Sequence, residues 1–397
     1  MAPEDNRLKS SSFHKFDPRR VPSPCYVVDV AAVETNLRIL HRVQQESGAK
    51  VLAALKAFSL WRLGELTGRY LSGTCASGLH EALLARDEYG GEVHVFSAAF
   101  CEEDLREILT FAHHVVFNSF GQWQRFQPLL LEAKRQRPQL SYGLRINPEH
   151  SEGDVPIYDP CAPCSRLGIP LSEFDGKEEL LEGISGLHFH TLCEQDFPPL
   201  ERTLKAVEEK FGHLLAQMEW VNFGGGHHIT RADYQVDQLI DAIKAFASRY
   251  DVQVYLEPGE AVAIHTGVLV SEVLDLPFSG MQQAILDTSA TCHMPDTLEM
   301  PYRADVFGAG APEEFEHLYR LGGMTCLAGD VIGDYSFDAP LEIGQRLMFD
   351  DMAHYTMVKT TTFNGINLPA IALWDSRTDE LDVIRQFGYR DFKERLS

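Results

Sequence analysis

Eight short apolar segments, separated by stretches with helical spacing, constrain the fold of this chain more than any other feature. The predicted strands are 51–55, 72–76, 93–97, 115–118, 141–146, 186–190, 219–223 and 252–257. Helices are predicted between them, among others at 78–89, 102–112, 119–136, 198–216 and 233–249. Eight strands in series with intervening helices favour a closed parallel barrel over an open sheet. The sequence therefore predicts an α/β fold with a TIM-like (β/α)8 barrel over residues 51–266.

The chain on either side of this repeat follows a different pattern. Residues 1–20 are polar and predict a flexible N-terminal arm. Residues 21–50 contain a predicted strand at 26–29, followed by a predicted helix. After residue 266, strand-like segments follow one another without long helices, at 267–274, 283–286, 346–349 and 370–374. We expect a C-terminal β-rich domain over residues 267–397, which the strand at 26–29 joins.

The charge balance and the apolar pattern exclude several classes of partner. The chain has 58 acidic and 35 basic residues and a net charge of -23, which argues against a nucleic-acid partner. No apolar run reaches membrane-spanning length, and the first residues lack the basic and apolar regions of a signal peptide. Eight cysteines among 397 residues do not indicate a disulfide framework. We therefore expect a cytoplasmic protein that binds neither nucleic acid nor membrane.

Lys56 directly follows the first predicted barrel strand and is the most informative single residue. The active site of a (β/α)8 barrel lies at the carboxyl ends of its strands, where the lysine is placed. A lysine amine can attack a carbonyl and bind an aldehyde covalently. The alternative is a lysine that simply reaches solvent at the rim of the barrel. Arg145 and the pair His188 and His190 are also placed at strand ends.

The last two predicted strands end in groups that suit a phosphorylated cofactor. Gly224, Gly225 and Gly226 follow the seventh strand, where bare backbone can approach a phosphate group. Glu257 ends the eighth strand, where a carboxylate can hold a ring nitrogen protonated. An ordinary glycine turn and a surface glutamate are the alternatives. Together with Lys56, these groups indicate a site for a lysine-bound aldehyde cofactor.

Two histidine pairs and a CxxC motif raise the alternative of a metal site. His188 and His190 alternate along one predicted strand and so share one face. His227 and His228 follow the glycine run, but no nearby carboxylates complete a convincing set of ligands. Cys161 and Cys164 form a single CxxC motif without a second pair, which makes zinc improbable. The sequence therefore predicts no metal.

Five segments, taken in order, resemble the carboxynorspermidine/carboxyspermidine decarboxylases, a branch of the alanine-racemase-like enzymes that use pyridoxal 5'-phosphate. The segments are 54–58, 186–194, 222–228, 257–261 and 329–335. Two further stretches, 290–296 and 359–365, are specific to this branch. The resemblance extends from about residue 24 to the C-terminal tail. It implies a head-to-tail homodimer of barrel and β-rich domains, with active sites shared across the interface.

The resemblance also implies a role for particular residues. Lys56 would bind the aldehyde of the cofactor, His190 would stack on its ring, and Glu257 would pair with its pyridine nitrogen. Further contacts are implied for Arg145, which would support the cofactor, and for Tyr355 and the glycine run Gly224, Gly225 and Gly226, which would bind its phosphate. Cys326 and Asp330 would enter the site of the partner subunit, with Cys326 as a candidate acid that returns a proton to the product.

The chain departs from its wider family at two positions. Glu260 stands where relatives usually carry an arginine that meets the phosphate. A carboxylate there would be repelled by phosphate unless it faced a cation, so we expect it to bind an amine of a carboxy-triamine substrate, with Asp296 at the distal end. Thr74 stands where ornithine-type relatives carry an aspartate. Decarboxylation of another cationic amino acid, such as diaminopimelate, arginine or ornithine, and a non-catalytic cofactor-binding protein remain as alternatives.

Overall fold

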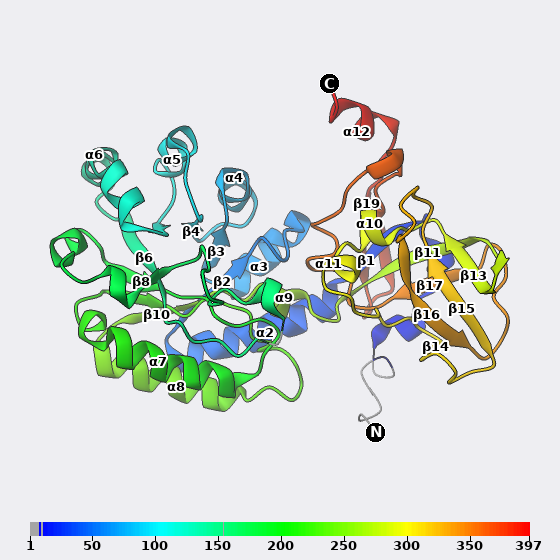
Figure 1. The fold of residues 1–397 in the computed structure, drawn as a ribbon, viewed down its shortest axis with the longest axis horizontal. Coiled ribbons are helices and arrows are strands. Elements are labelled where there is room, and N and C mark those ends of the chain that lie inside the picture. The colour runs from blue at the N-terminus through cyan, green and yellow to red at the C-terminus, as the bar shows by residue number, and fades with distance from the viewer. Residues whose placement is uncertain (1–7, 9–10, 154) are drawn as a thin grey trace. The chain divides into compact units, whose positions relative to one another are not determined.

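The computed structural model describes residues 8, 11–153 and 155–397, which form two compact units (Figure 1). The barrel unit comprises residues 34–262. The sheet unit combines the N-terminal segment up to Val33 with residues 263–397. The sheet unit is therefore assembled from both ends of the chain, and the barrel unit is inserted between them in sequence.

Eight parallel strands close the barrel unit, as the sequence predicted. They are β2 (Lys50–Ala54), β3 (Gly73–Ala76), β4 (Glu92–Phe96), β5 (His114–Phe117), β6 (Ser141–Asn147), β8 (Gly186–His188), β9 (Trp220–Asn222) and β10 (Gln253–Leu256). Each strand pairs in parallel with the next, and β10 pairs with β2 to close the ring. Parallel strands place all their carboxyl ends at one rim.

Helices surround this ring of strands (Figure 1). They are α2 (Val30–Ser47), α3 (Gly64–Tyr70), α4 (Leu79–Glu88), α5 (Glu102–Ile108), α6 (Phe120–Gln136), α7 (Phe197–Leu215) and α8 (Val236–Tyr250). In α7, Leu200, Leu204, Val207 and Phe211 are buried at helical spacing and form one apolar face. No helix within the described residues combines the length and apolar character needed to cross a bilayer.

The long segment after β6 contains only short elements. They are the 3-10 turns η4 (Pro156–Tyr158), η5 (Leu171–Glu173) and η6 (Glu178–Leu181), and the two-residue strand β7 (Ile169–Pro170), which pairs with the end of β6. Through this pairing, the C-terminal end of the predicted long loop lies next to the end of β6 at the barrel rim.

A ten-stranded mixed sheet forms the sheet unit. Its strands are β1 (Cys25–Asp29), β11 (Gly267–Asp275), β12 (Phe278–Ser279), β13 (Met281–Leu286), β14 (Ala309–Gly310), β15 (His317–Gly322), β16 (Val331–Phe337), β17 (Arg346–Phe349), β18 (Ala370–Asp375) and β19 (Glu380–Arg385). The early strand β1 lies between β11, with which it is antiparallel, and β18, with which it is parallel. Two short helices, α10 (Ala290–His293) and α11 (Asp296–Glu299), lie between β13 and β14 in the sequence. Helix α12 (Tyr389–Glu394) follows β19, and α9 (Glu260–Ala263) follows β10 of the barrel and precedes β11.

Residues 11–20 correct the prediction of a flexible arm. They form two 3-10 turns, η1 (Ser12–Lys15) and η2 (Pro18–Arg20). Phe13 is 0% exposed and Phe16 is 4% exposed, and both pack against Trp374 in the core of the sheet unit. Burial of two aromatic rings holds this segment against the sheet, although its overall composition is polar. Residues 1–7 and 9–10 lie outside the described part of the chain.

Trp220 fills the barrel interior because two neighbouring strands carry glycine beside it. Gly143 on β6 pairs with Gly186 on β8, and both face the indole ring. A Cβ atom at Gly186 would lie 2.0 Å from the indole, and one at Gly143 would lie 2.4 Å from it. The indole Nε1 donates to Ser141 Oγ at 2.9 Å, which satisfies its polar group.

Gly186→Ala should destabilise the barrel unit, because the added methyl group displaces a buried indole. Overpacking of this kind costs about 1–3 kcal/mol in the free energy of unfolding, measured by denaturant titration. Gly212→Ala on α7 is the matched control, since its Cβ would meet nothing closer than Tyr250 Oη at 3.5 Å. The control should gain about 0.5–1 kcal/mol from helix propensity. Equal stability of the two variants would contradict the packing argument.

Candidate active site

The carboxyl-end rim of the barrel unit brings together the polar residues predicted from the sequence. Lys56 lies in the turn after β2 and is exposed, and Arg145 is on β6. His190 lies two residues beyond the end of β8, and the glycine run follows β9. Glu257 is the first residue after β10. Because the strands are parallel, all five positions meet at one rim.

The carboxylate of Glu257 is held at this rim by two neighbouring side chains. Its Oε1 accepts a hydrogen bond from Asn222 Nδ2 at 2.7 Å, and its Oε2 lies 3.3 Å from His188 Nε2. Burial alone would raise the pKa of Glu257, but His188 and Asn222 outweigh burial and lower it to about 2. Burial lowers the pKa of His188. Glu257 is therefore an ionised acceptor at neutral pH.

Cys75 on β3 is a further neighbour of this carboxylate. Burial and the charge of Glu257 raise the pKa of its thiol well above the usual value. The thiol is therefore protonated at neutral pH and does not add a second negative charge. The adjacent Thr74, one of the two departures from the wider family, is buried, and its hydroxyl has no hydrogen-bond partner among the described residues.

Arg145 is a buried cation inside the rim. It is 4% exposed, its Nη2 donates to the carbonyl oxygen of His190 at 3.2 Å, and its guanidinium lies 4.6 Å from the ring centroid of Phe96. Burial lowers its pKa to about 10, so the side chain stays charged. No carboxylate of the described residues forms an ion pair with it. A buried cation of this kind suits an anionic ligand.

His190 and the glycine run are joined by a hydrogen bond. The amide of Gly225 donates to His190 Nδ1 at 3.1 Å, which leaves the proton of the neutral ring on Nε2. Burial, followed by the charges of Lys56 and Arg145, lowers the pKa of His190 well below its usual value. The ring is therefore neutral and fixed in orientation, which suits a stacking role better than a charged role.

The glycine run approaches other backbone too closely for side chains. Gly224 and Gly226 have φ values of +70° and +84°, and a Cβ at Gly226 would lie 1.9 Å from the carbonyl oxygen of Leu192. The amide of Gly224 donates to Asn222 Oδ1 at 2.8 Å, and that of Gly225 donates to His190. Within the described residues, only the Gly226 amide of the three has no acceptor. The run thus offers fewer free amides than the sequence suggested.

Glu260 begins α9 at the same rim and lies beside a histidine. Its Oε2 is 3.2 Å from His228 Nε2, and His228 is buried. His228 follows the glycine run by two residues, so this contact lies next to Gly226. A carboxylate at this position favours a cationic ligand group over an anionic one.

Two predicted site residues lie in a loop of the sheet unit. Cys326 is exposed, and its amide donates to Asn364 Oδ1 at 2.7 Å. Asp330 is buried and accepts hydrogen bonds from Ser289 Oγ at 3.0 Å and from both the amide and the hydroxyl of Thr325, at 3.0 and 2.7 Å. The carboxylate of Asp330 therefore holds the loop that carries Cys326. To bind a substrate amine, it would have to release one of these donors.

Asp296 and Tyr355 are also in the sheet unit. Lys359 Nζ lies 2.5 Å from Asp296 Oδ1 and 2.6 Å from Glu299 Oε2, so two carboxylates share one ammonium group. This cluster keeps a net negative charge. Tyr355 is partly exposed, and its ring meets that of His354 edge to face.

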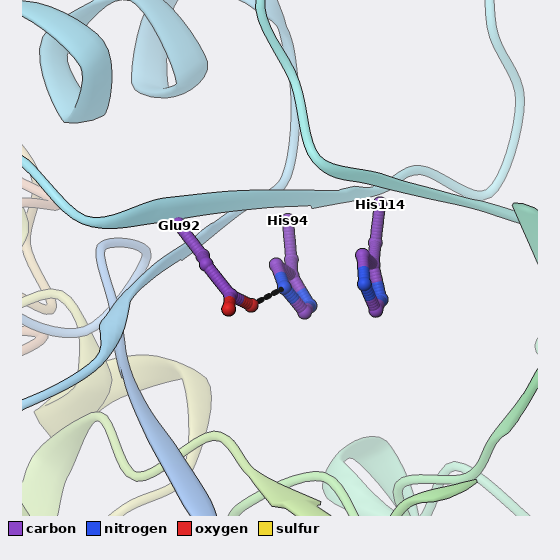
Figure 2. A group of neighbouring side chains, drawn as sticks. All are labelled: Glu92, His94 and His114. Carbon is purple, nitrogen blue, oxygen red and sulfur yellow. Dashed lines mark hydrogen bonds and ion pairs between the residues drawn. The ribbon is translucent and has the colours of Figure 1, made fainter. Parts of the chain in front are cut away.

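A polar cluster at the opposite end of the barrel was not singled out from the sequence. Glu92, His94 and His114 lie side by side on β4 and β5 (Figure 2). The carboxylate of Glu92 already has three partners: Lys50 Nζ at 2.5 Å, His94 Nε2 at 2.9 Å and Tyr255 Oη at 3.2 Å. A metal ion would have to displace the ammonium group of Lys50.

The two histidine rings of this cluster stack at 3.9 Å with an interplanar angle of 19°. Burial and the neighbouring His94 lower the pKa of His114 to about 2, so His114 stays neutral. We conclude that the cluster is a salt-bridged part of the barrel core. The only sequence signal for it was the presence of polar residues at the starts of buried strands.

Comparison with known proteins agrees with this geometry. Residues 25–353 match the family model described as "Pyridoxal-dependent decarboxylase, C-terminal sheet domain". The chain belongs to the pyridoxal-dependent decarboxylases, and its cofactor is pyridoxal phosphate. Diaminopimelate decarboxylase from Helicobacter pylori, solved with L-lysine, shares the fold at a TM-score of 0.78 and 17% identity, over 95% of this chain and 97% of that one.

Two more similar relatives and one more similar crystal structure define a narrower branch. Carboxynorspermidine/carboxyspermidine decarboxylase from Campylobacter jejuni is 46% identical over 95% of this chain and 99% of that protein. Carboxyaminopropylagmatine decarboxylase from Synechocystis is 45% identical over 95% of this chain and 96% of that protein. A crystal structure of the Campylobacter jejuni carboxynorspermidine decarboxylase with norspermidine matches at a TM-score of 0.86 and 44% identity, over 94% and 100% of the two chains.

The rim offers a partner for each part of pyridoxal phosphate. Lys56 has an exposed amine that would suit the aldehyde, and Glu257 has an ionised carboxylate that would suit the ring nitrogen. Gly226 supplies bare backbone for the phosphate, since any side chain there would collide with Leu192. The buried guanidinium of Arg145 would suit the negative charge of the cofactor. The residues present therefore fit the cofactor.

Proposed function

We propose that this protein decarboxylates a carboxylated triamine, carboxynorspermidine or carboxyspermidine, to norspermidine or spermidine and CO2. One observation carries this proposal. A relative solved with norspermidine matches 94% of the chain at 44% identity and a TM-score of 0.86. The product of that relative is a polyamine, and the acidic residue Glu260 at the rim suits a cationic substrate.

The residues of the rim divide the chemical work. When bound, the protonated cofactor ring accepts the electrons that the departing carboxylate leaves behind. Glu257, held ionised by Asn222 and His188, keeps the ring nitrogen protonated. Lys56 would hold the cofactor through its side-chain amine between turnovers and would release it when the primary amine of the substrate binds. Cys326 or Lys56 returns a proton to the carbon that lost CO2.

Two carboxylates are proposed to recognise the amines of the substrate. Glu260 accepts one ammonium group near the cofactor, and Asp296 accepts the distal one. In this structure the carboxylate of Asp296 forms an ion pair with the ammonium group of Lys359. This ion pair supports the proposal that the carboxylate can accept an ammonium group. Asp330 contributes by holding the loop of Cys326 and, if it releases a donor, by direct contact with the substrate. Tyr355 is proposed to donate to the phosphate.

The working form is proposed to be a homodimer with shared sites. Apolar side chains beside Cys326 are exposed: Met324 is 47% exposed, Leu327 is 45% and Phe363 is 45%. Exposed apolar groups around a catalytic cysteine support burial against a second subunit.

The cytoplasm is proposed as the location because all eight cysteines are free thiols.

A carboxylated aminopropylagmatine is a second candidate substrate. The relative from Synechocystis that is named for it is 45% identical, nearly the same as the 46% of the Campylobacter jejuni relative. This substrate ends in a guanidinium group, whereas the triamines end in an ammonium group. The paired carboxylates of Asp296 and Glu299 can accept either group, so substrate tests must include both.

The proposal is tested by measuring CO2 release from a panel of substrates. We expect the highest kcat/KM with carboxynorspermidine or carboxyspermidine. Carboxyaminopropylagmatine, diaminopimelate, ornithine and arginine should each be at least about tenfold poorer, which corresponds to about 1.4 kcal/mol of discrimination. A preference for the guanidinium substrate would select the second candidate. Absence of CO2 release from every substrate would support a non-catalytic cofactor-binding protein.

Lys56→Ala should abolish both turnover and the visible absorbance of the lysine-bound cofactor, since no other amine replaces it. If Cys326→Ala is also inactive, mixing it with Lys56→Ala tests the shared site. If Cys326 serves the partner, random reassociation restores about a quarter of wild-type activity, because half the dimers are mixed and each has one intact site. No recovery would place both residues in one subunit's site. Full activity of either single variant would remove that residue from the mechanism.

Glu260→Gln should raise KM for the triamine about 10- to 100-fold with a smaller effect on kcat, because one charge-assisted contact to an ammonium group is lost. Glu201→Gln on α7 is the matched control, since that glutamate is exposed and lies 3.9 Å from Lys205 Nζ, away from the strand ends of the rim. Steady-state kinetics of both variants decide the role. An unchanged kcat/KM in Glu260→Gln would exclude Glu260 from the substrate site.

A further inference from the structure

Asn222 occupies a central position that no single sequence motif explains. It is the last residue of β9 and is 1% exposed. Its neighbours in register are His188 on β8 and Tyr255 on β10. Asn222 therefore lies between the strand that carries His188 and the strand that leads to Glu257. Its own strand leads directly into the glycine run.

The carboxamide of Asn222 makes one hydrogen bond with each of two functional elements. Its Nδ2 donates to Glu257 Oε1 at 2.7 Å, and its Oδ1 accepts from the amide of Gly224 at 2.8 Å. The chemistry of these partners fixes the orientation of the amide group. A carboxylate can only accept and a backbone N–H can only donate, so a flipped amide would lose both bonds.

The backbone reinforces the same connection. The amide of Glu257 donates to the carbonyl oxygen of Gly224 at 2.7 Å. A Cβ at Gly225 would lie 2.1 Å from the carbonyl oxygen of Glu257, so the two segments are in direct contact. A displacement of the glycine run would therefore pull on Glu257, and Asn222 is the only side chain of the described residues that hydrogen-bonds to both segments.

We propose that Asn222 is a positioning residue that couples the phosphate end of the cofactor site to its pyridine-nitrogen end. Through one rigid amide it sets the position of the Gly224 backbone and orients the carboxylate of Glu257. The two ends of the cofactor are then held at a fixed separation by a single side chain. This inference rests on cofactor binding and not on the identity of the substrate, so the substrate panel and the test below fail independently.

An ordinary asparagine that closes a strand end is the competing explanation, and Asn118, which is half-buried, provides a comparison within the chain. Asn118 follows β5, donates to the carbonyl oxygen of Arg166 at 2.8 Å and accepts from the amide of Gly168 at 2.7 Å. It makes the same pair of bonds but contacts neither Glu257 nor the glycine run. Asn118→Ala therefore controls for the loss of two hydrogen bonds.

The test observes both ends of the cofactor by nuclear magnetic resonance. The wild type, Asn222→Ala and Asn118→Ala are reconstituted with pyridoxal phosphate that carries 15N in its ring, and the 15N and 31P signals are recorded. In Asn222→Ala, a carboxylate that has lost its donor becomes more basic and draws the proton off the ring, so the 15N signal should move toward that of unprotonated pyridine. The 31P signal should move as well, and the Kd of the cofactor should rise about tenfold or more.

Asn118→Ala should leave both signals at their wild-type positions. Asn222→Asp serves as a second variant if Asn222→Ala does not fold. It keeps the acceptor for Gly224 but removes the donor to Glu257, so it should move the 15N signal and leave the 31P signal. The coupling is refuted if Asn222→Ala moves neither signal or only one, or if Asn118→Ala moves both by the same amount.

Discussion

A carboxylate kept ionised inside a barrel is the constraint on which the rest of this site depends. Glu257 is mostly shielded from water, and burial alone would favour its neutral form. Asn222 and His188 reverse that preference; Asn222 is on β9, next to β10, and His188 is on β8, one strand further round the barrel. The closed parallel barrel is what makes this possible, because it delivers three strand ends to one point. The ionised state of Glu257 therefore depends on the barrel topology that brings Asn222 and His188 to it.

Much of the barrel could be predicted from the sequence because its signals are local. Apolar strands alternate with amphipathic helices, and each predicted strand lies within two residues of an observed one at both ends. Lys56, Arg145 and Glu257 stood out because charged residues rarely end buried strands. Their meeting at one rim follows from parallel pairing, which the strand–helix alternation already implied.

The remaining features depend on contacts between distant segments. The strands β15 and β16 have no strong alternation and form because they pair with each other, while β15 also pairs with β13 and β16 with β14. Phe13 and Phe16 lie in a polar segment, and their burial depends on a core of distant residues such as Val268 and Trp374. In the site, no sequence pattern shows that the amides of Gly224 and Gly225 are already engaged. The periodicity of a sequence does not identify which groups on different strands form hydrogen bonds with one another.

The assembly of the sheet unit from both chain ends has a consequence for how the protein is made. Ribosomes deliver the N-terminus first, so β1 emerges about 340 residues before its parallel neighbour β18. The whole barrel can close during that interval, while both edges of β1 stay unpaired, because β11 and β18 both follow the barrel in the sequence. An exposed apolar strand edge invites intermolecular pairing. Slow or interrupted translation downstream of the barrel should therefore favour aggregation of the nascent chain.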